Sequence, residues 1–128
     1  MAESLILLDT SILIDYFRKK DKTKTRLYEL TDHYEGFVIS VITEFEIYVR
    51  AKADQRPFWE RFLNAIPVIP FDSSVAEIAV DLNSQLKVSK NQIAIADLFI
   101  ASTAISLGIP CASLNHKHFG RLKDLVLV

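Results

Sequence analysis

The sequence predicts a single α/β domain, residues 1–128, in which helices cover both faces of a central parallel sheet. Short apolar stretches typical of strands alternate with segments of helical periodicity, the order of elements found in parallel sheets. Glycine and proline are scarce, with 3 and 4 residues, so long irregular loops are not expected. A chain of 128 residues is also long enough to bury a core.

Composition and charge exclude several classes of protein. No run approaches the roughly 18 apolar residues of a membrane span, and the start lacks the basic segment of a signal peptide. We therefore expect a cytoplasmic protein without a membrane partner. The net charge of −1 means that nucleic acid would be bound by a local basic patch. The single cysteine, Cys111, excludes an internal disulfide and is expected in the core.

The first predicted strand is the apolar run at residues 5–8, which ends abruptly at an acid, Asp9. A helical pattern follows at residues 12–17, with Thr10 or Ser11 as its expected cap. Ligand sites in parallel sheets lie beyond the carboxyl ends of the strands, so Asp9 is the first candidate site residue. Capping the same helix is the alternative role of this carboxylate.

The next elements are a helix at residues 25–33, a second strand at residues 37–40 and a helix at residues 41–53. Gly36 breaks the pattern before the second strand. The apolar face of the helix at residues 41–53 is expected to consist of Ile42, Phe45, Val49 and, less clearly, Ile47.

A further helix is predicted around Pro57, a residue that suits the first turn of a helix. Its aromatic side chains belong either to a partner surface or to the core, and they are Phe58, Trp59 and Phe62. The segment at residues 66–71 is predicted to be a short strand, and its prolines favour an edge position in the sheet.

The last third of the chain predicts two more helices. One covers residues 75–86 after a cap at residues 72–74, and the more regular one covers residues 93–107 and is stopped by Gly108. The expected strands in this part are residues 111–114 and a last short strand at residues 125–128.

Asp97 is the second candidate site residue because it interrupts an apolar helix face. That face of the helix at residues 93–107 consists of Ile93, Ile100, Ala101 and Ala104. A carboxylate in its middle is costly unless it is paired, hydrogen-bonded or bound to a metal. The alternative is that the helix begins here, with Asp97 as its N-cap.

Glu46 and Asn115 complete the set of candidates. Glu46 lies early in the helix after the second strand, although Thr43 and Glu46 also have the spacing of a capping box. Glu44 points about 200° around the helix from Glu46, so only one of the two can face the site. Asn115 follows the fourth strand, with Ser113 two residues before it.

Such residues at one end of a parallel sheet predict a site for a hard cation. Carboxylate and amide oxygens, with few histidines or thiols nearby, favour Mg²⁺ or Mn²⁺ over zinc. The simplest chemistry of this site is hydrolysis of a phosphodiester by activated water. Ser11 and Ser113 would orient water or a carboxylate, and His116 and His118 are interpreted as surface residues or phosphate contacts.

Four segments resemble, in order, the motifs of PIN-domain proteins, and most of all those of VapC-type toxins of toxin–antitoxin pairs. They are residues 8–15, 39–47, 97–104 and 113–119. The resemblance runs nearly the full length, from Leu5 to Leu122. It implies an endoribonuclease that depends on Mg²⁺ or Mn²⁺, in a PIN-like sheet of four to five strands with the order 3-2-1-4-5.

The resemblance also implies roles for single residues. The three acids of the family correspond to Asp9, Glu46 and Asp97, of which Asp9 and Asp97 would hold the metal. The family's hydroxyl residues correspond to Ser11 and Ser113. Asn115 stands where the family often has an acid, a departure that weakens a second metal site more than the first.

The partners that the resemblance implies are an RNA substrate, with tRNA a leading class, a cognate antitoxin and a second copy of the chain in a homodimer. The basic segment at residues 18–26 is either a solvated helix end or a rim that contacts phosphates. From charge, the RNA backbone would follow Arg18, Lys19, Lys117 and Arg121, with Lys87 and Lys90 in addition.

Other functions remain open at this point. A PIN-fold nuclease of RNA processing would share the site, and a binding module derived from the fold would keep its shape without cutting. A receiver-like module would use an acid after the third strand, where Asp72 is available. A phosphatase of the haloacid dehalogenase type requires a second aspartate where this chain has Ser11.

Overall fold

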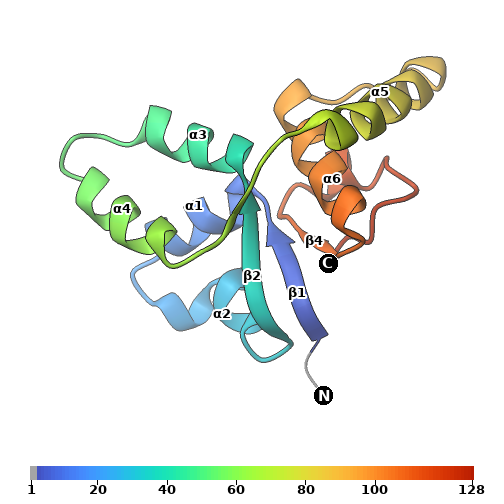
Figure 1. Ribbon diagram of the computed structural model, residues 1–128. Coiled ribbons are helices and arrows are strands. Elements are labelled where there is room, and N and C mark those ends of the chain that lie inside the picture. The colour runs from blue at the N-terminus through green and yellow to red at the C-terminus, as the bar shows by residue number, and fades with distance from the viewer. Residues whose placement is uncertain (1–2) are drawn as a thin grey trace.

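A parallel sheet forms the centre of the computed structural model, which describes residues 3–128 (Figure 1). Its strands are β1 (Glu3–Leu8), β2 (Tyr34–Ser40), β3 (Val68–Ile69) and β4 (Cys111–Ala112), in the order β3-β2-β1-β4. The α/β class and the edge position of the third strand are confirmed. In the described chain the expected strand at residues 125–128 is reduced to an isolated parallel bridge between Leu127 and Cys111, so the sheet has four strands.

The side chains of the strands alternate between two buried faces. Leu7 pairs with Val38 of β2 and with Cys111 of β4, and all three side chains belong to one apolar cluster. Ile6 and Leu8, their neighbours along β1, belong to the other cluster. A parallel sheet covered on both faces requires this apolar character at successive positions. Cys111 is fully buried, as predicted.

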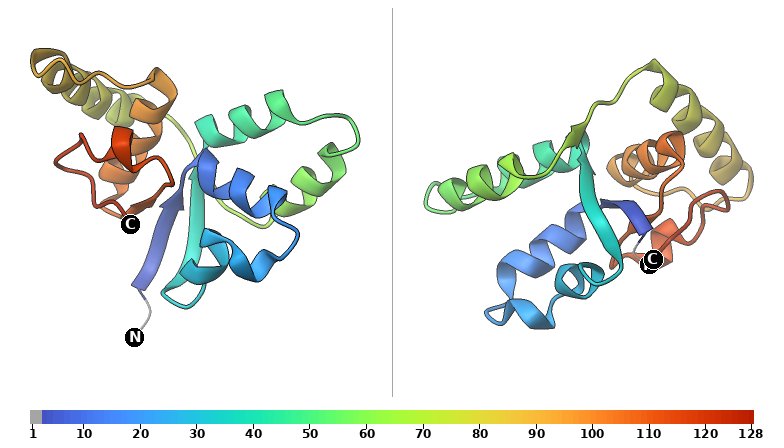
Figure 2. Two further views of the ribbon diagram at one scale, coloured as in Figure 1. Left: turned by 180° about the vertical axis from the view of Figure 1, so that it is seen from behind. Right: turned by 60° about the horizontal axis from the view of Figure 1, so that its bottom comes forward.

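The helices form two groups on the two faces of the sheet (Figure 2). The group on the face of Ile6 and Leu8 consists of α1 (Thr10–Arg18), α2 (Arg26–Leu30), α3 (Val41–Arg50) and α4 (Arg56–Asn64), with the short 3-10 helix η1 (Lys22–Lys24) before α2. The other group consists of α5 (Ser73–Val88), α6 (Ile95–Leu107) and α7 (His116–Phe119). No helix in the described residues is long and apolar enough to cross a membrane.

Two details at the start of the chain differ from expectation. The N-cap of α1 is Asp9, so the prediction of Thr10 or Ser11 as cap was wrong. Gly36 does not break the pattern but lies inside β2, opposite Leu5 of β1. A Cβ atom at this position would approach the Cδ2 atom of Leu5 to 2.9 Å, so a larger residue here would require only a shift of that exposed side chain.

The buried face of α3 also differs from expectation. Ile47 is 1% exposed, whereas Phe45 is 66% and Val49 is 64% exposed. The helix begins at Val41, and Thr43 and Ile47, which are four residues apart, face the protein interior. The size of the apolar side chains was therefore a poor guide to the orientation of this helix.

The aromatic side chains of α4 belong to the core instead of a free surface. Trp59 is 2% exposed and lies 5.0 Å from Phe17 between ring centroids. Phe58 and Phe62 are half-buried in the same apolar cluster, where Phe62 also meets Tyr16. The core interpretation is confirmed for these three residues, because they attach α4 to α1.

The helix that carries Asp97 begins later than predicted. Its N-cap is Ala94, so Ile93 lies outside α6 and Asp97 lies in the first turn. Asp97 is therefore not the N-cap, and it is not enclosed by a stripe of apolar residues on both sides. The other end was predicted correctly, since α6 ends at Gly108, whose φ of +66° is the left-handed conformation that glycine adopts readily.

Candidate active site

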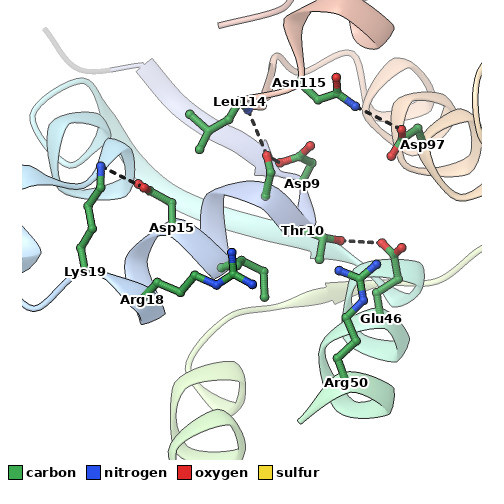
Figure 3. A pocket seen from close by; sticks show the side chains of 12 residues that line it. Asp9, Thr10, Asp15, Arg18, Lys19, Glu46, Arg50, Asp97, Leu114 and Asn115 are labelled. Atoms are coloured by element: carbon green, nitrogen blue, oxygen red, sulfur yellow. Dashed lines mark hydrogen bonds and ion pairs between the residues drawn. The ribbon is translucent and has the colours of Figure 1, made fainter.

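A cleft opens where the carboxyl ends of β1 and β2 meet the first turn of α6. Its volume is about 550 Å³. All four candidate residues line it, and Figure 3 shows them converging from four segments of the chain: Asp9, Glu46, Asp97 and Asn115. In the order β3-β2-β1-β4, the strands β2 and β4 lie on opposite sides of β1, so the strand order reverses there. Open parallel sheets bind ligands at such a switch point.

Asp9 lies at the bottom of the cleft and is 3% exposed. Its Oδ1 atom accepts hydrogen bonds from the Ser11 hydroxyl at 2.6 Å and the Ile12 N–H at 3.2 Å. Its Oδ2 atom accepts from the Ser113 hydroxyl at 2.5 Å. Burial raises the pKa of Asp9, the serine and backbone hydrogen bonds partly offset this, and the charge of Asp97 raises the pKa further.

Glu46 reaches the cleft from the second turn of α3. Its Oε1 atom accepts a hydrogen bond from the Thr10 hydroxyl at 2.6 Å, and the Thr10 and Thr43 hydroxyl oxygens are 3.2 Å apart. The N-cap of α3 is Ser40, so the capping box of Thr43 and Glu46 was wrong. Glu44 lines a different surface, as expected from its position around the helix.

Asp97 enters the cleft from the first turn of α6, where a negative charge is favoured by the helix dipole. Its Oδ2 atom lies 3.5 Å from Nδ2 of Asn115 and 3.6 Å from Nδ1 of His118. Burial raises the pKa of Asp97, His118 counteracts this, and the charge of Glu46 raises the pKa again. The three carboxylates therefore influence one another electrostatically.

Ser11 and Ser113 connect Asp9 to the loop after β4. Each hydroxyl donates to Asp9 and accepts from a backbone N–H, Ser11 from Leu114 at 3.0 Å and Ser113 from Asn115 at 2.8 Å. The two serines thus position the carboxylate and the loop together. These contacts support the predicted orienting role of the two serines in the reaction, which stays a prediction.

The basic candidates separate into two groups. Arg18 and Lys19 line the cleft, and Lys19 forms an ion pair with Asp15 at 3.0 Å. Lys117 and Arg121 lie outside the cleft lining. Arg121 donates to the backbone carbonyls of residues 91 and 92 at 3.3 and 2.9 Å. These hydrogen bonds attach the connection between α5 and α6 to the segment that follows α7. RNA contacts by these residues stay a prediction.

Three polar residues of the lining were not predicted as site residues: Thr10, Asp15 and Arg50. Arg50 lies one turn after Glu46, so helical spacing could have indicated that it shares the same side of α3. Asp15 accepts from the Arg26 N–H at 3.0 Å. Although burial raises the pKa of Asp15, this hydrogen bond and Lys19 lower it overall.

The donor atoms in the cleft suit a hard cation. No three acidic, histidine or cysteine side chains among residues 3–128 already converge as a complete ligand set. Mg²⁺, however, is commonly held by one or two carboxylates and several waters. Asp9 and Asp97 fit that pattern: the charge of Asp97 raises the pKa of Asp9, and a cation held by both carboxylates would relieve this repulsion.

Comparisons with known proteins agree on one family. A family model described as "PIN domain" matches residues 6–125. The chain is 38% identical over 127 residues to Ribonuclease VapC1 of Methanocaldococcus jannaschii, across 98% of this chain and 86% of the relative. Its fold resembles a 27% identical chain in a toxin–antitoxin complex from Klebsiella pneumoniae, with a TM-score of 0.78 and coverage of 96% and 95%. It also resembles a 25% identical chain of VapBC2 from Rickettsia felis bound to a promoter DNA fragment, with a TM-score of 0.80 and 97% coverage of each chain.

Proposed function

The chain belongs to the PIN-domain family and to the VapC ribonucleases within it, and on this basis we propose that it is an endoribonuclease that acts as the toxin of a type II toxin–antitoxin pair. The observation that carries the proposal is the cleft in which Asp9, Glu46 and Asp97 converge from β1, α3 and α6. The reaction is hydrolysis of an RNA phosphodiester bond by water.

We assign Asp9 and Asp97 as ligands of Mg²⁺ or Mn²⁺. Oδ2 of Asp9 accepts a single hydrogen bond, so a lone pair remains for a cation, and Oδ1 of Asp97 has no hydrogen bond within the described residues. When bound, such a cation acidifies a water molecule and neutralises charge on a phosphoryl oxygen.

We assign Glu46 as the residue that orients and deprotonates the attacking water. The Thr10 hydroxyl occupies Oε1, and Oε2 has no hydrogen bond within residues 3–128, so this oxygen can accept the proton of a water in the cleft. Ser11 and Ser113 hold Asp9 in place during the reaction. Asn115 offers a neutral oxygen or an N–H at the rim beside Asp97.

The partners follow from the same assignment. The similar chains from Klebsiella pneumoniae and Rickettsia felis come from a toxin–antitoxin complex and from VapBC2, so we propose that a cognate antitoxin inhibits this chain. We also propose a homodimer, which sedimentation of the purified protein would detect. Growth arrest upon expression, relieved by a DNA-binding protein encoded next to the chain, would support the toxin role over a role in RNA processing.

The decisive experiment measures Mn²⁺- or Mg²⁺-dependent cleavage of total RNA by the purified protein. Asp9→Asn and Asp97→Asn should each lower the cleavage rate at least about 100-fold, because loss of a catalytic electrostatic group costs roughly 3 kcal/mol or more. Asp81→Asn is the matched control, since Asp81 is an exposed residue of α5 outside the cleft lining. Equal cleavage by wild type and both site variants would contradict the assignment, and cleavage that persists in EDTA would contradict the metal.

A further inference from the structure

Two arginines line the cleft without a side-chain partner among the described residues, 3–128. Arg18 ends α1 and Arg50 ends α3, and both line the cleft that holds the three acids. Figure 3 shows their guanidinium groups on the side formed by α1 and α3, with Asp9 and Asp97 across from them. Within residues 3–128 neither guanidinium group makes a hydrogen bond, an ion pair or a cation–π contact.

Two lysines of this region, Lys19 and Lys22, are already engaged. Lys19 is paired with Asp15 at 3.0 Å. Lys22 donates to the carbonyls of Tyr16, Phe17 and Lys19 at 2.5, 3.1 and 2.8 Å, at the carboxyl end of α1. These lysines have structural partners that an incoming ligand would have to displace. The two arginines can bind a ligand without breaking a contact.

Arg50 is unpaired although its position favours an ion pair. Glu46 lies four residues before it on the same helix, and a glutamate followed by a cation at this spacing is the stabilising order. Glu46 instead accepts the hydrogen bond of Thr10 at 2.6 Å. The charge of Arg50 is therefore left for another anion, and the exposed Arg18 is in the same state.

We propose that Arg18 and Arg50 together bind the phosphates next to the cleaved bond of a single-stranded RNA segment. This inference rests on the proposed ribonuclease function. It assigns substrate binding to the wall of the cleft that α1 and α3 form. The planar guanidinium group binds phosphate oxygens in a bidentate manner, and within residues 3–128 no acid forms an ion pair with either arginine.

The size of the cleft favours a single strand. Its volume of about 550 Å³ lies within the range of roughly 300–1,000 Å³ that encloses small ligands. Such a space matches a few nucleotides of an unpaired strand. Contacts to phosphates carry no base information, so the arginines should contribute to affinity for every sequence alike.

The test compares Arg18→Gln, Arg50→Gln and the double variant in cleavage of an unpaired RNA oligonucleotide. Each single variant should raise KM about tenfold with kcat changed less than about twofold, because uniform binding is lost and chemistry is retained. The slope of log(kcat/KM) against log salt should fall by about 0.7 for each phosphate contact removed. Arg61→Gln, at an exposed arginine of α4 outside the cleft, is the matched control and should change neither quantity.

The outcomes separate this proposal from the one on which it rests. If the wild type does not cut RNA, the proposed function fails. If the wild type cuts, and KM and the salt slope of the double variant equal those of the wild type, only the arginine assignment is overturned. It is also overturned if the variants keep KM but escape inhibition by the antitoxin, because the arginines would then serve a protein partner. Melting curves of all variants identify any loss of folding.

Discussion

At the scale of single residues, Asp9 caps a helix and also lines the cleft, which sequence patterns present as alternatives. Its Oδ1 atom caps α1 through the Ile12 N–H, and its Oδ2 atom faces the hydroxyl of Ser113. A carboxylate has two oxygens with separate directions, so capping a helix does not remove it from a cleft. The cap in fact orients the side chain that the proposed site requires.

Thr10 provides a test at this scale. We expect Thr10→Val to lower kcat about tenfold, because the hydrogen bond to the charged Glu46 is worth roughly 1.5–3 kcal/mol and positions its carboxylate. The valine is similar in shape and removes only the hydroxyl. Steady-state kinetics on an RNA substrate measure the effect, with KM expected to stay within about twofold.

Thr10→Ser is the control, because it restores the hydroxyl that donates to Glu46. Recovery of most of kcat in this variant, with a pH profile like that of the wild type, would separate positioning from a general loss of packing. A serine variant as slow as the valine variant would exclude the hydrogen bond as the cause.

At the scale of elements, the basic segment after α1 is in large part structural. The ammonium group of Lys22 binds three carbonyls at the end of α1, where a positive charge also compensates the helix dipole. Asp15 joins α1 to the start of α2 through the Arg26 N–H. The sequence left two interpretations of residues 18–26, a solvated helix end or a rim that contacts phosphates. Of these residues, we propose the contact with phosphate for Arg18 alone.

Asp15→Asn should destabilise the protein by about 1 kcal/mol at neutral pH, because a charged hydrogen bond to Arg26 and the pair with Lys19 are weakened. The pKa of Asp15 is lowered in the folded state, so its contribution is complete above the ordinary value of 3.8. It is lost as the pH falls through the folded pKa. Urea unfolding of both proteins measures the difference, which should shrink below about pH 4.

A stability difference that persists unchanged at low pH would contradict the role of the ionised carboxylate. Asp81→Asn, an exposed aspartate of α5, should show no comparable difference at any pH.

At the scale of the whole molecule, strand order assembles the cleft. β1 lies between β2 and β4, so Asp9 meets Ser113 although 104 residues separate them. The first turn of α6 then carries Asp97 to the same edge. Burial raises the pKa values of Asp9 and Asp97, and the charge of Asp97 adds to the first increase and that of Glu46 to the second. This edge of the fold is therefore electrostatically costly without a cation.

Mn²⁺ should therefore raise the melting temperature of the protein by several degrees at neutral pH, since a ligand that binds only the folded state stabilises it. A concentration of 100 times Kd corresponds to about 2.7 kcal/mol. The increase should become smaller as the pH falls toward the raised pKa values, because protons then compete for the carboxylates. Differential scanning fluorimetry measures it.

The Asp9→Asn and Asp97→Asn variants should lose most of this increase, whereas Glu44→Gln, on a different surface of α3, should retain it. An equal increase in all four proteins would place the cation elsewhere.

Much of the fold was predictable because strand and helix periodicity are local properties of the chain. The wrong predictions concern residues whose burial or position in an element depends on contacts with distant parts of the chain. Phe45 has the apolarity of a core residue, yet it is exposed because Ile47 meets the interior. Gly36 resembles a break, yet it lies inside β2, where it pairs with Leu5 of β1.

The sequence by itself determined the α/β class and the polar residues that follow the strands, among them Asp9 and Asn115, because an apolar run and its end can be recognised within a few residues. Only the tertiary structure decided which side chains share a cleft and which charges remain unpaired. Whether Glu46 is held by Thr10 or by Arg50 depends on competition between partners 36 and 4 residues away. That competition exists only once the strands have taken their order in the sheet.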